Sequence, residues 1–333
     1  MFSKKLKKSH QKKSASSNTT KLNAHAVIDI GTNTVILLIG KALKTKIKVL
    51  HDEAIITRLG EGLTEHHFFQ SPAMNRTLDI LARYKQTCEK YKIKKIVAVG
   101  TASFRTAANT EVFLAKAEEK LGLKIQVITG DEEAEYVFSA AHTDFGNLSE
   151  KLLVVDIGGG STEIITGPLN SKNFIPENLI SLALGSVRLT EQHVRSDPIS
   201  DDEFKRLLVI IRNGLSDELD DFYPHRDFKN YVMVATAGTA TTLAALDQQL
   251  ASYNPQKVHG YKLTKSNLEN LVTRLAKMSL HERQKLPGLE PLRADVILAG
   301  GLLLNEILRY FGKNEVIISD RGLRFGVFSK KFL

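Results

Sequence analysis

The chain of 333 residues contains one cysteine, Cys88, and no tryptophan. A single cysteine excludes an intramolecular disulfide, which fits a reducing compartment. No apolar run reaches the roughly 18 residues that a membrane-spanning helix needs. The basic N-terminus has neither the apolar core of a secretion signal nor the arginines of a transit peptide. We therefore expect a cytoplasmic protein without a membrane partner.

Acidic residues are absent from the first 21 positions, which hold seven lysines. These lysines supply +7 of the formal net charge of +9 and leave +2 on the rest of the chain. We expect residues 1–23, rich in Ser, Lys and Asn, to be a disordered basic tail. The remaining chain is close to neutral and predicts no specific nucleic-acid partner.

The length and the alternation of strands with helices predict an α/β protein of two domains. We place the N-terminal domain at residues 24–144 and the C-terminal domain at 145–333. In the first we expect strands within 26–39 and at 46–59, 95–100 and 124–129, with helices at 71–91, 110–121 and 131–142. In the second we expect strands at 152–156, 231–236 and 315–319, with helices near 200–215, 264–278 and 321–331.

One stretch, Leu152–Glu163, carries the strongest signal of a phosphate site; it reads Leu-Leu-Val-Val-Asp-Ile-Gly-Gly-Gly-Ser-Thr-Glu. An apolar strand ends at Asp156, and the three glycines that follow let several backbone N–H groups converge on one oxyanion. The stretch Ala26–Thr34 repeats Asp-Ile-Gly at Asp29, 127 residues earlier. Two such strand–turn–strand units facing each other would hold a phosphate chain from both sides.

Eight motifs follow one another along the chain. They are Asp29-Ile-Gly-Thr-Asn-Thr, Arg58-Leu-Gly-Glu-Gly-Leu, Gly100-Thr-Ala-Ser-Phe-Arg-Thr-Ala, Thr129-Gly-Asp-Glu-Glu-Ala, Asp156-Ile-Gly-Gly-Gly-Ser-Thr-Glu, Leu184-Gly-Ser-Val-Arg, Ala237-Gly-Thr-Ala-Thr-Thr-Leu-Ala and Ser319-Asp-Arg-Gly-Leu-Arg. Together they resemble the exopolyphosphatase/guanosine pentaphosphate phosphohydrolase (Ppx/GppA) family of the actin-like ATPase superfamily. The resemblance implies a two-domain actin-like (ribonuclease H-like) α/β fold with the active site in the interdomain cleft. It also implies that the last segment, about residues 320–333, packs back on the first domain.

The carboxylates of these motifs are the candidate catalytic and metal-binding groups. The resemblance identifies Glu133 as the catalytic general base, although an acid in the first turn of a helix more often only complements the helix dipole. Asp29, Asp156 and Glu163 are candidate ligands of Mg²⁺ or Mn²⁺, since Mg²⁺ is usually bound by one or two carboxylates together with substrate phosphates. We count Asp156 and Glu163 among the catalytic residues as well; an exposed strand position is the alternative for Glu163.

Two kinds of phosphate contact are expected. Glycine turns and a glycine-containing helix start present backbone N–H groups and hydroxyls, whereas the guanidinium of Arg105 suits bidentate phosphate binding. The full set is Gly31, Thr32, Asn33, Arg105, Gly158, Gly159, Gly160, Ser161, Thr162, Gly238 and Thr239. The chain departs from the family pattern at Ile36, where His or Arg is common, and at Phe325, where Glu is usual. Both departures are expected to alter phosphate affinity or substrate choice.

These motifs predict metal-dependent hydrolysis of phosphoanhydrides. Our first expectation is an exopolyphosphatase that releases terminal orthophosphate from inorganic polyphosphate. The second is hydrolysis of guanosine pentaphosphate, with guanosine tetraphosphate as a related ligand, because phosphate-binding motifs do not distinguish substrates that present the same group. Whether the chain forms a homodimer is left open.

Two other classes of function are weighed against hydrolysis. An actin-like ATPase or sugar kinase would also fit Asp29, Asp156 and Ala299-Gly-Gly, but the glutamate pair within Thr129–Ala134 argues against it. A non-catalytic regulator that binds polyphosphate or alarmone is disfavoured because four carboxylates, Asp29, Glu133, Asp156 and Glu163, are present together.

Overall fold

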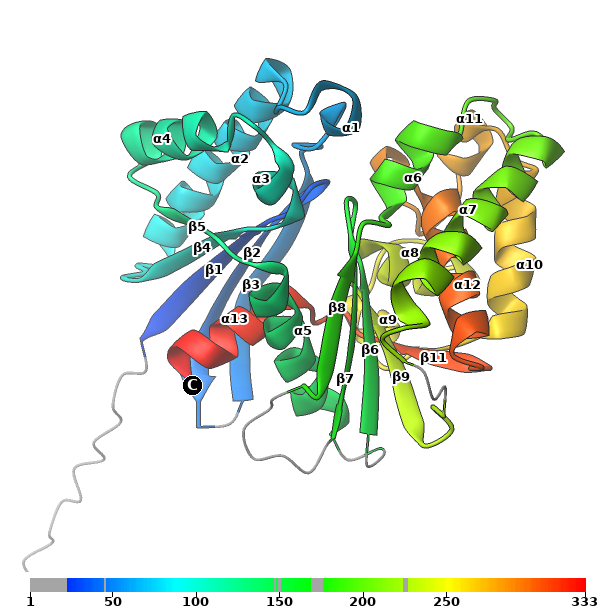
Figure 1. Ribbon diagram of the computed structural model, residues 1–333. Coiled ribbons are helices and arrows are strands. Elements are labelled where there is room, and N and C mark those ends of the chain that lie inside the picture. Colours follow the sequence, from blue (N-terminus) through cyan, green and yellow to red (C-terminus); the bar gives the residue numbers. More distant parts are fainter. Residues whose placement is uncertain (1–22, 45, 147, 149–150, 169–175, 224–226) are drawn as a thin grey trace, which may run out of the picture.

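The computed structural model describes residues 23–333 apart from 45, 147, 149–150, 169–175 and 224–226, so the predicted tail lies outside the described residues except for residue 23. Figure 1 shows two sheets, each with helices on its outer face. Within the described residues none of the helices combines the length and the apolar character needed to span a bilayer.

The first sheet has the strand order β3-β2-β1-β4-β5. Its strands are β1 (Ala24–Ile30), β2 (Thr34–Leu43), β3 (Lys46–Ile56), β4 (Ile96–Gly100) and β5 (Ile125–Val127). Strands β1 to β3 are antiparallel neighbours, whereas β4 and β5 continue the sheet in parallel with β1. The accompanying helices are α1 (Leu63–His66), α2 (Ser71–Lys90), α3 (Ala102–Thr106) and α4 (Thr110–Leu121).

The second sheet has the order β10-β11-β9-β6-β7-β8 and repeats this plan, because an antiparallel hairpin is again followed by parallel strands. Its strands are β6 (Lys151–Ile157), β7 (Thr162–Pro168), β8 (Asn178–Leu182), β9 (Tyr231–Thr236), β10 (Lys262–Thr264) and β11 (Glu315–Ile318). The helices are α6 (Ser186–His193), α7 (Asp201–Leu219), α8 (Ala237–Asp247), α9 (Pro255–Val258), α10 (Lys265–Ala276), α11 (Leu280–Arg283), η1 (Pro291–Arg293) and α12 (Ile297–Tyr310).

Two further helices, α5 (Gly130–Phe145) and α13 (Leu323–Phe332), lie side by side between the sheets (Figure 1). They share an apolar core with both sheets, to which Val27 and Val154 belong. Helix α13 contacts β1 and β2, and the Phe332 ring stacks on His25 with centroids 4.2 Å apart. The C-terminal segment therefore packs against the first sheet.

The two central strands place their aspartates on facing sides. Side chains alternate between the two faces of a strand. In β1, Ile28 packs toward α2 on the outer face, whereas Val27 belongs to the core around α5 and α13. Asp29 has the parity of Val27, and Asp156 in β6 has the parity of Val154. Both aspartates therefore lie on the faces that the sheets turn toward each other.

The structure confirms the local signals of the sequence and corrects the assignment of one stretch. The helices predicted at 131–142 and near 200–215 are present as α5 and α7, and capping boxes at Thr129 and Ser200 begin them. The Ala299-Gly-Gly stretch, which was compatible with a kinase, lies inside α12 and not in a phosphate-binding loop. A Cβ at Gly300 would come within 2.6 Å of the Thr239 side chain, so this glycine allows α12 to pack closely against α8.

Candidate active site

A cavity of about 120 Å³ lies between the sheets, where β1 and β6 end. Most of the predicted site residues meet there. It is lined by Asp29, Gly31, Thr32, Asn33, Thr34, Ile36, Thr101, Ala102, Glu133, Asp156, Ile157, Gly158, Gly159, Gly160, Ser161, Ser186, Ala237, Gly238, Thr239, Arg293, Val296, Ile297, Gly322, Leu323 and Arg324.

The two Asp-Ile-Gly turns have the same local geometry and face each other across this cavity. The Gly31 N–H donates to the Thr34 carbonyl at 2.9 Å, and the Gly158 N–H donates to the Ser161 carbonyl at 3.0 Å. A Cβ at Gly160 would lie 3.3 Å from Thr32 Oγ1, so the turns approach closely because position 160 has no side chain. Helix α8 adds its first turn at Gly238 and Thr239. Three sets of backbone N–H groups thus border one small cavity, which suits a phosphate.

Four carboxylates lie in or beside the cavity, and each has a raised pKa. Burial raises the pKa of Asp29 to about 7. Burial, followed by repulsion from Glu163, raises the pKa of Glu133 and of Asp156 well above their usual values. Burial also raises the pKa of Glu163. Each acid is desolvated, and most of them repel one another, so a cation bound nearby would favour their charged forms.

Glu133 lies in the first turn of α5 and borders the cavity. Arg105 Nη1 donates to Glu133 Oε2 at 2.8 Å and to the Ile128 carbonyl at 3.0 Å. Arg105, predicted to bind phosphate, is absent from the cavity lining and instead fixes this carboxylate.

Glu163 and Thr162 lie behind the second turn. Glu163 Oε1 accepts from the Ser161 and Ser181 hydroxyls at 2.8 Å each, and its side chain is almost fully buried. The Thr162 hydroxyl donates to the Leu184 carbonyl at 2.6 Å. Neither residue lines the cavity, so the structure does not bring the predicted Thr162 contact or the predicted Glu163 ligand to its surface.

The predicted metal ligands do not form a closed cage. In the part of the chain that the structure describes, no three His, Cys, Asp or Glu side chains are placed to hold one ion. Asp29 and Asp156 both border the cavity, and these two match the small number of protein ligands typical of Mg²⁺, whose remaining positions are filled by water and substrate oxygens. The two aspartates therefore fit an ion that is shared with a bound phosphate.

Sequence reasoning missed two arginines of the site. Arg293 donates from Nη2 to Thr34 Oγ1 at 3.1 Å, and among the described residues it forms no ion pair. A Cβ at Gly238 would come within 1.6 Å of the Arg293 Nη1, so the guanidinium lies directly on this glycine. Arg293 belongs to none of the eight motifs, so no pattern in the sequence pointed to it.

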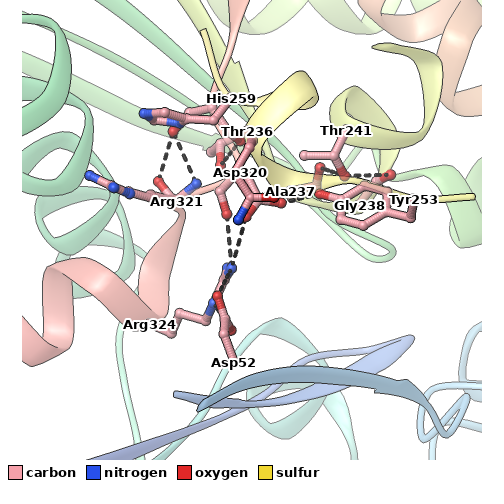
Figure 2. Close-up of polar contacts among 12 residues, drawn as sticks. Asp52, Thr236, Ala237, Gly238, Thr241, Tyr253, His259, Asp320, Arg321 and Arg324 are labelled. Atoms are coloured by element: carbon pink, nitrogen blue, oxygen red, sulfur yellow. Dashed lines mark hydrogen bonds and ion pairs between the residues drawn. The ribbon is translucent and has the colours of Figure 1, made fainter. Parts of the chain in front are cut away.

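Arg324 belongs to the last motif and also borders the cavity, but its charge is compensated. It forms a bidentate ion pair with Asp52 of β3 at 2.8 and 2.9 Å, and Asp320 Oδ2 lies 3.6 Å from its Nη2 (Figure 2). These acids raise the pKa of Arg324 despite its burial. Among the described residues that line this cavity, Arg293 is therefore the cation with no paired carboxylate.

The structure places the two residues that differ from the family pattern, Ile36 and Phe325. Ile36 borders the cavity and gives it an apolar patch. Phe325 is buried in the layer between the sheets, with the Arg324 guanidinium 4.9 Å from its ring centroid.

A larger cavity of about 690 Å³ adjoins the first and shares Ile36, Ala237, Gly238, Arg293 and Arg324 with it. Its other lining residues include Tyr253, apolar side chains of β3, and the acids Asp52, Glu290 and Asp320. Figure 2 shows Asp52 and Asp320 on two sides of Arg324, with Tyr253, the partner of Asp320, farther to the right.

The comparisons with known proteins agree with this geometry. The family model described as Ppx/GppA phosphatase family matches residues 38–333. The chain is 33% identical over 306 residues to the bifunctional 3-dehydroquinate synthase/phosphatase of Fusobacterium nucleatum, covering 89% of this chain and 44% of that protein. It is 32% identical over 315 residues to exopolyphosphatase 2 of Mycobacterium tuberculosis, covering 91% and 96%. The guanosine-5'-triphosphate,3'-diphosphate pyrophosphatase of Vibrio atlanticus is 30% identical over 312 residues, covering 93% and 60%.

The chain thus spans less than two thirds of the first and third of these relatives and nearly all of the second. The crystal structure of the Aquifex aeolicus member of the Ppx/GppA family superimposes with a TM-score of 0.76 at 33% identity, covering 93% of this chain and 97% of that one. This likeness, together with the two sheets and their helices, confirms the predicted α/β fold of the Ppx/GppA family.

Proposed function

Since this chain belongs to the Ppx/GppA phosphatase family, we propose that it is a phosphoanhydride hydrolase that releases terminal orthophosphate from inorganic polyphosphate. The observation that carries the proposal is the position of Glu133. This buried carboxylate is held by Arg105 at the edge of a cavity built from two phosphate-binding turns. One relative, of which the match covers 96%, is named exopolyphosphatase 2.

In the proposed reaction, the turns at Gly31 and Gly158 and the first turn of α8 hold the terminal phosphate through backbone N–H groups. Arg293 supplies a positive charge from the side of Gly238. Glu133 Oε1, which has no hydrogen-bond donor among the described residues, accepts a proton from the attacking water. A raised pKa makes Glu133 a stronger base than an ordinary glutamate, and Arg105 keeps it oriented.

We propose Mg²⁺, or Mn²⁺, as the cofactor, held by Asp29 and Asp156. Three carboxylates border the cavity, whereas Arg293 is the one lining cation without an acid partner among the described residues. Charged carboxylates repel a phosphate anion, so further positive charge would favour its binding in this cavity. When bound, a divalent ion supplies this charge and stabilises the charge that develops on the phosphoryl oxygens. Glu163 adds negative charge from behind the turn without reaching the surface.

Guanosine pentaphosphate is the second candidate substrate, and one observation favours it. The 690 Å³ cavity shares lining residues with the phosphate site and has room for a nucleoside, with Tyr253 and apolar side chains in its wall. A relative at 30% identity is named for hydrolysis of such a nucleotide. A sugar kinase is disfavoured, since the buried carboxylate of Glu133 borders the cavity, where our proposal needs a base for water, and Ala299-Gly-Gly is part of a packed helix. A cytoplasmic location remains a prediction, and whether the chain forms a homodimer stays open.

A substrate panel on the unmodified protein tests the proposal. Phosphate release is measured with long polyphosphate, tripolyphosphate, guanosine pentaphosphate, and ATP with or without sugars, each with Mg²⁺. We expect the highest kcat/KM on polyphosphate without any nucleotide. Higher kcat/KM on guanosine pentaphosphate would make the second candidate the function. Phosphate transfer from ATP to a sugar, or binding of polyphosphate without turnover under any divalent metal, would reject hydrolysis.

A further inference from the structure

The motif Arg58–Leu63 has no role in the mechanism above, although its backbone is bound to the first phosphate turn. The N–H groups of Thr57 and Arg58 both donate to the Asn33 carbonyl at 3.0 Å, and the Gly60 N–H donates to the Thr32 carbonyl at 2.8 Å. The backbone of Arg58 has a φ of 52°, which residues other than Gly, Asn and Asp rarely adopt. This unusual backbone conformation occurs at a residue whose side chain points from the first domain toward the second.

The Arg58 side chain crosses the cleft to the segment that carries Arg293. Its Nη2 donates to the Leu292 carbonyl and to Asp295 Oδ2, each at 2.8 Å. Asp295 is itself fixed, because its Oδ1 accepts from the Val296 N–H at 3.0 Å. Arg58 therefore holds the residue before Arg293 and a residue just after it.

A second arginine crosses in the opposite direction. Arg293 starts from the second domain and donates to Thr34 Oγ1, which belongs to the same hairpin that Arg58 is bound to. The two arginines form a reciprocal clasp, made of Arg58 with Leu292 and Asp295 and of Arg293 with Thr34. The core between the sheets, around α5 and α13, lies elsewhere and does not depend on the clasp for its packing.

We propose that Arg58 is a positioning residue that keeps the Arg293 guanidinium in the phosphate cavity. The inference rests on the proposed function, because it assigns Arg293 to the substrate phosphate. Without Arg58, the segment Leu292–Asp295 loses its two charge-assisted bonds to the first domain, and Arg293 keeps only a neutral hydroxyl contact. Binding of the phosphate must then order the Arg293 guanidinium, and this entropy cost weakens substrate binding. The chemical step is unchanged.

The test compares kcat and KM on tripolyphosphate for Arg58→Gln, Arg293→Gln and the double variant. Arg58→Gln should raise KM about three- to tenfold with kcat changed less than twofold, because two charge-assisted bonds are lost from a partly exposed pair. The double variant should bind no worse than Arg293→Gln alone, since Arg58 acts only through Arg293. Arg58→Lys keeps the charge and should fall between the parent and Arg58→Gln.

Arg83→Gln is the matched control, because it removes one surface ion pair, with Glu53, inside the first domain. Its KM should equal that of the parent. Additive losses in the double variant, or a loss confined to kcat, would overturn the proposal. If the parent hydrolyses polyphosphate and Arg58→Gln has the parental KM, the role of Arg58 is overturned, while the proposed function stands. Absence of activity from the parent on every substrate would instead reject the proposed function.

Discussion

The contact between Gly238 and Arg293 allows the phosphate role of Arg293 to be tested without changing the arginine. A Cβ at position 238 would lie 1.6 Å from Arg293 Nη1 and 2.5 Å from its Cζ, so Gly238→Ala forces the guanidinium away. The group displaced is the far end of a flexible side chain that borders an open cavity. The fold should therefore tolerate the substitution, whereas the cavity loses its unpaired cation.

The size of the effect follows from the bond that is lost. A hydrogen bond to a charged group is worth about 1.5–3 kcal/mol, which corresponds to roughly 10- to 150-fold in kcat/KM. Arg293→Gln should show a loss of this order, and Gly238→Ala should reproduce most of it. The combined variant should be no worse than Arg293→Gln alone, because both changes remove the same contact.

The assay is phosphate release from tripolyphosphate with Mg²⁺, together with thermal unfolding of each variant. Gly214→Ala serves as the control glycine, because it lies in the interior of α7, its Cβ would meet the side chain of Leu184 at 3.2 Å, and neither residue lines the cavity. The reasoning is refuted if Gly238→Ala unfolds at the parental temperature with parental kcat/KM, or if its loss adds to that of Arg293→Gln.

Three further results are expected. Glu133 must be ionised to act as a base, and Arg105 lowers its pKa against the effect of burial, so Arg105→Gln should move the acidic limb of the kcat/KM profile to higher pH; an unmoved limb would contradict the assignment. Chelation of divalent metal should abolish phosphate release and added Mg²⁺ should restore it, with Asp156→Asn requiring more Mg²⁺ than the parent; full activity in chelator would exclude the metal. Gly326→Ala should destabilise the fold by about 1–3 kcal/mol or more in denaturant unfolding, because its Cβ would lie 1.8 Å from the Tyr136 carbonyl oxygen, and unchanged stability would refute close packing of α13 on α5.

Features that depend on neighbouring residues could be predicted from the sequence. The Asp-Ile-Gly turns at Asp29 and Asp156 are set by glycines and by hydrogen bonds that span three residues. The capping boxes at Thr129 and Ser200 are equally local. Strand parity then suffices to turn both aspartates toward the same cleft, because each ends an apolar strand.

Features that depend on distant segments could not be predicted. Arg293 is brought to the cavity by a fold that joins it to Thr34, 259 positions earlier. The side chain of Glu163 is held away from the surface by Ser181 of β8, a strand that no sequence pattern predicted. Helix α12 was missed because it is buried on almost all sides, so its residues show no alternation of apolar and polar positions.

The central claim is that Glu133 activates water for attack on a terminal phosphate bound between the two turns. It is tested most directly by single-turnover phosphate release from tripolyphosphate with Mg²⁺, comparing the parent with Glu133→Gln, together with substrate binding measured on the same samples. Glutamine keeps the shape and the Arg105 contact can persist, so binding should change less than fivefold while the rate falls by about 10²–10⁴-fold. A Glu133→Gln rate within a few-fold of the parent at equal substrate occupancy would contradict the claim.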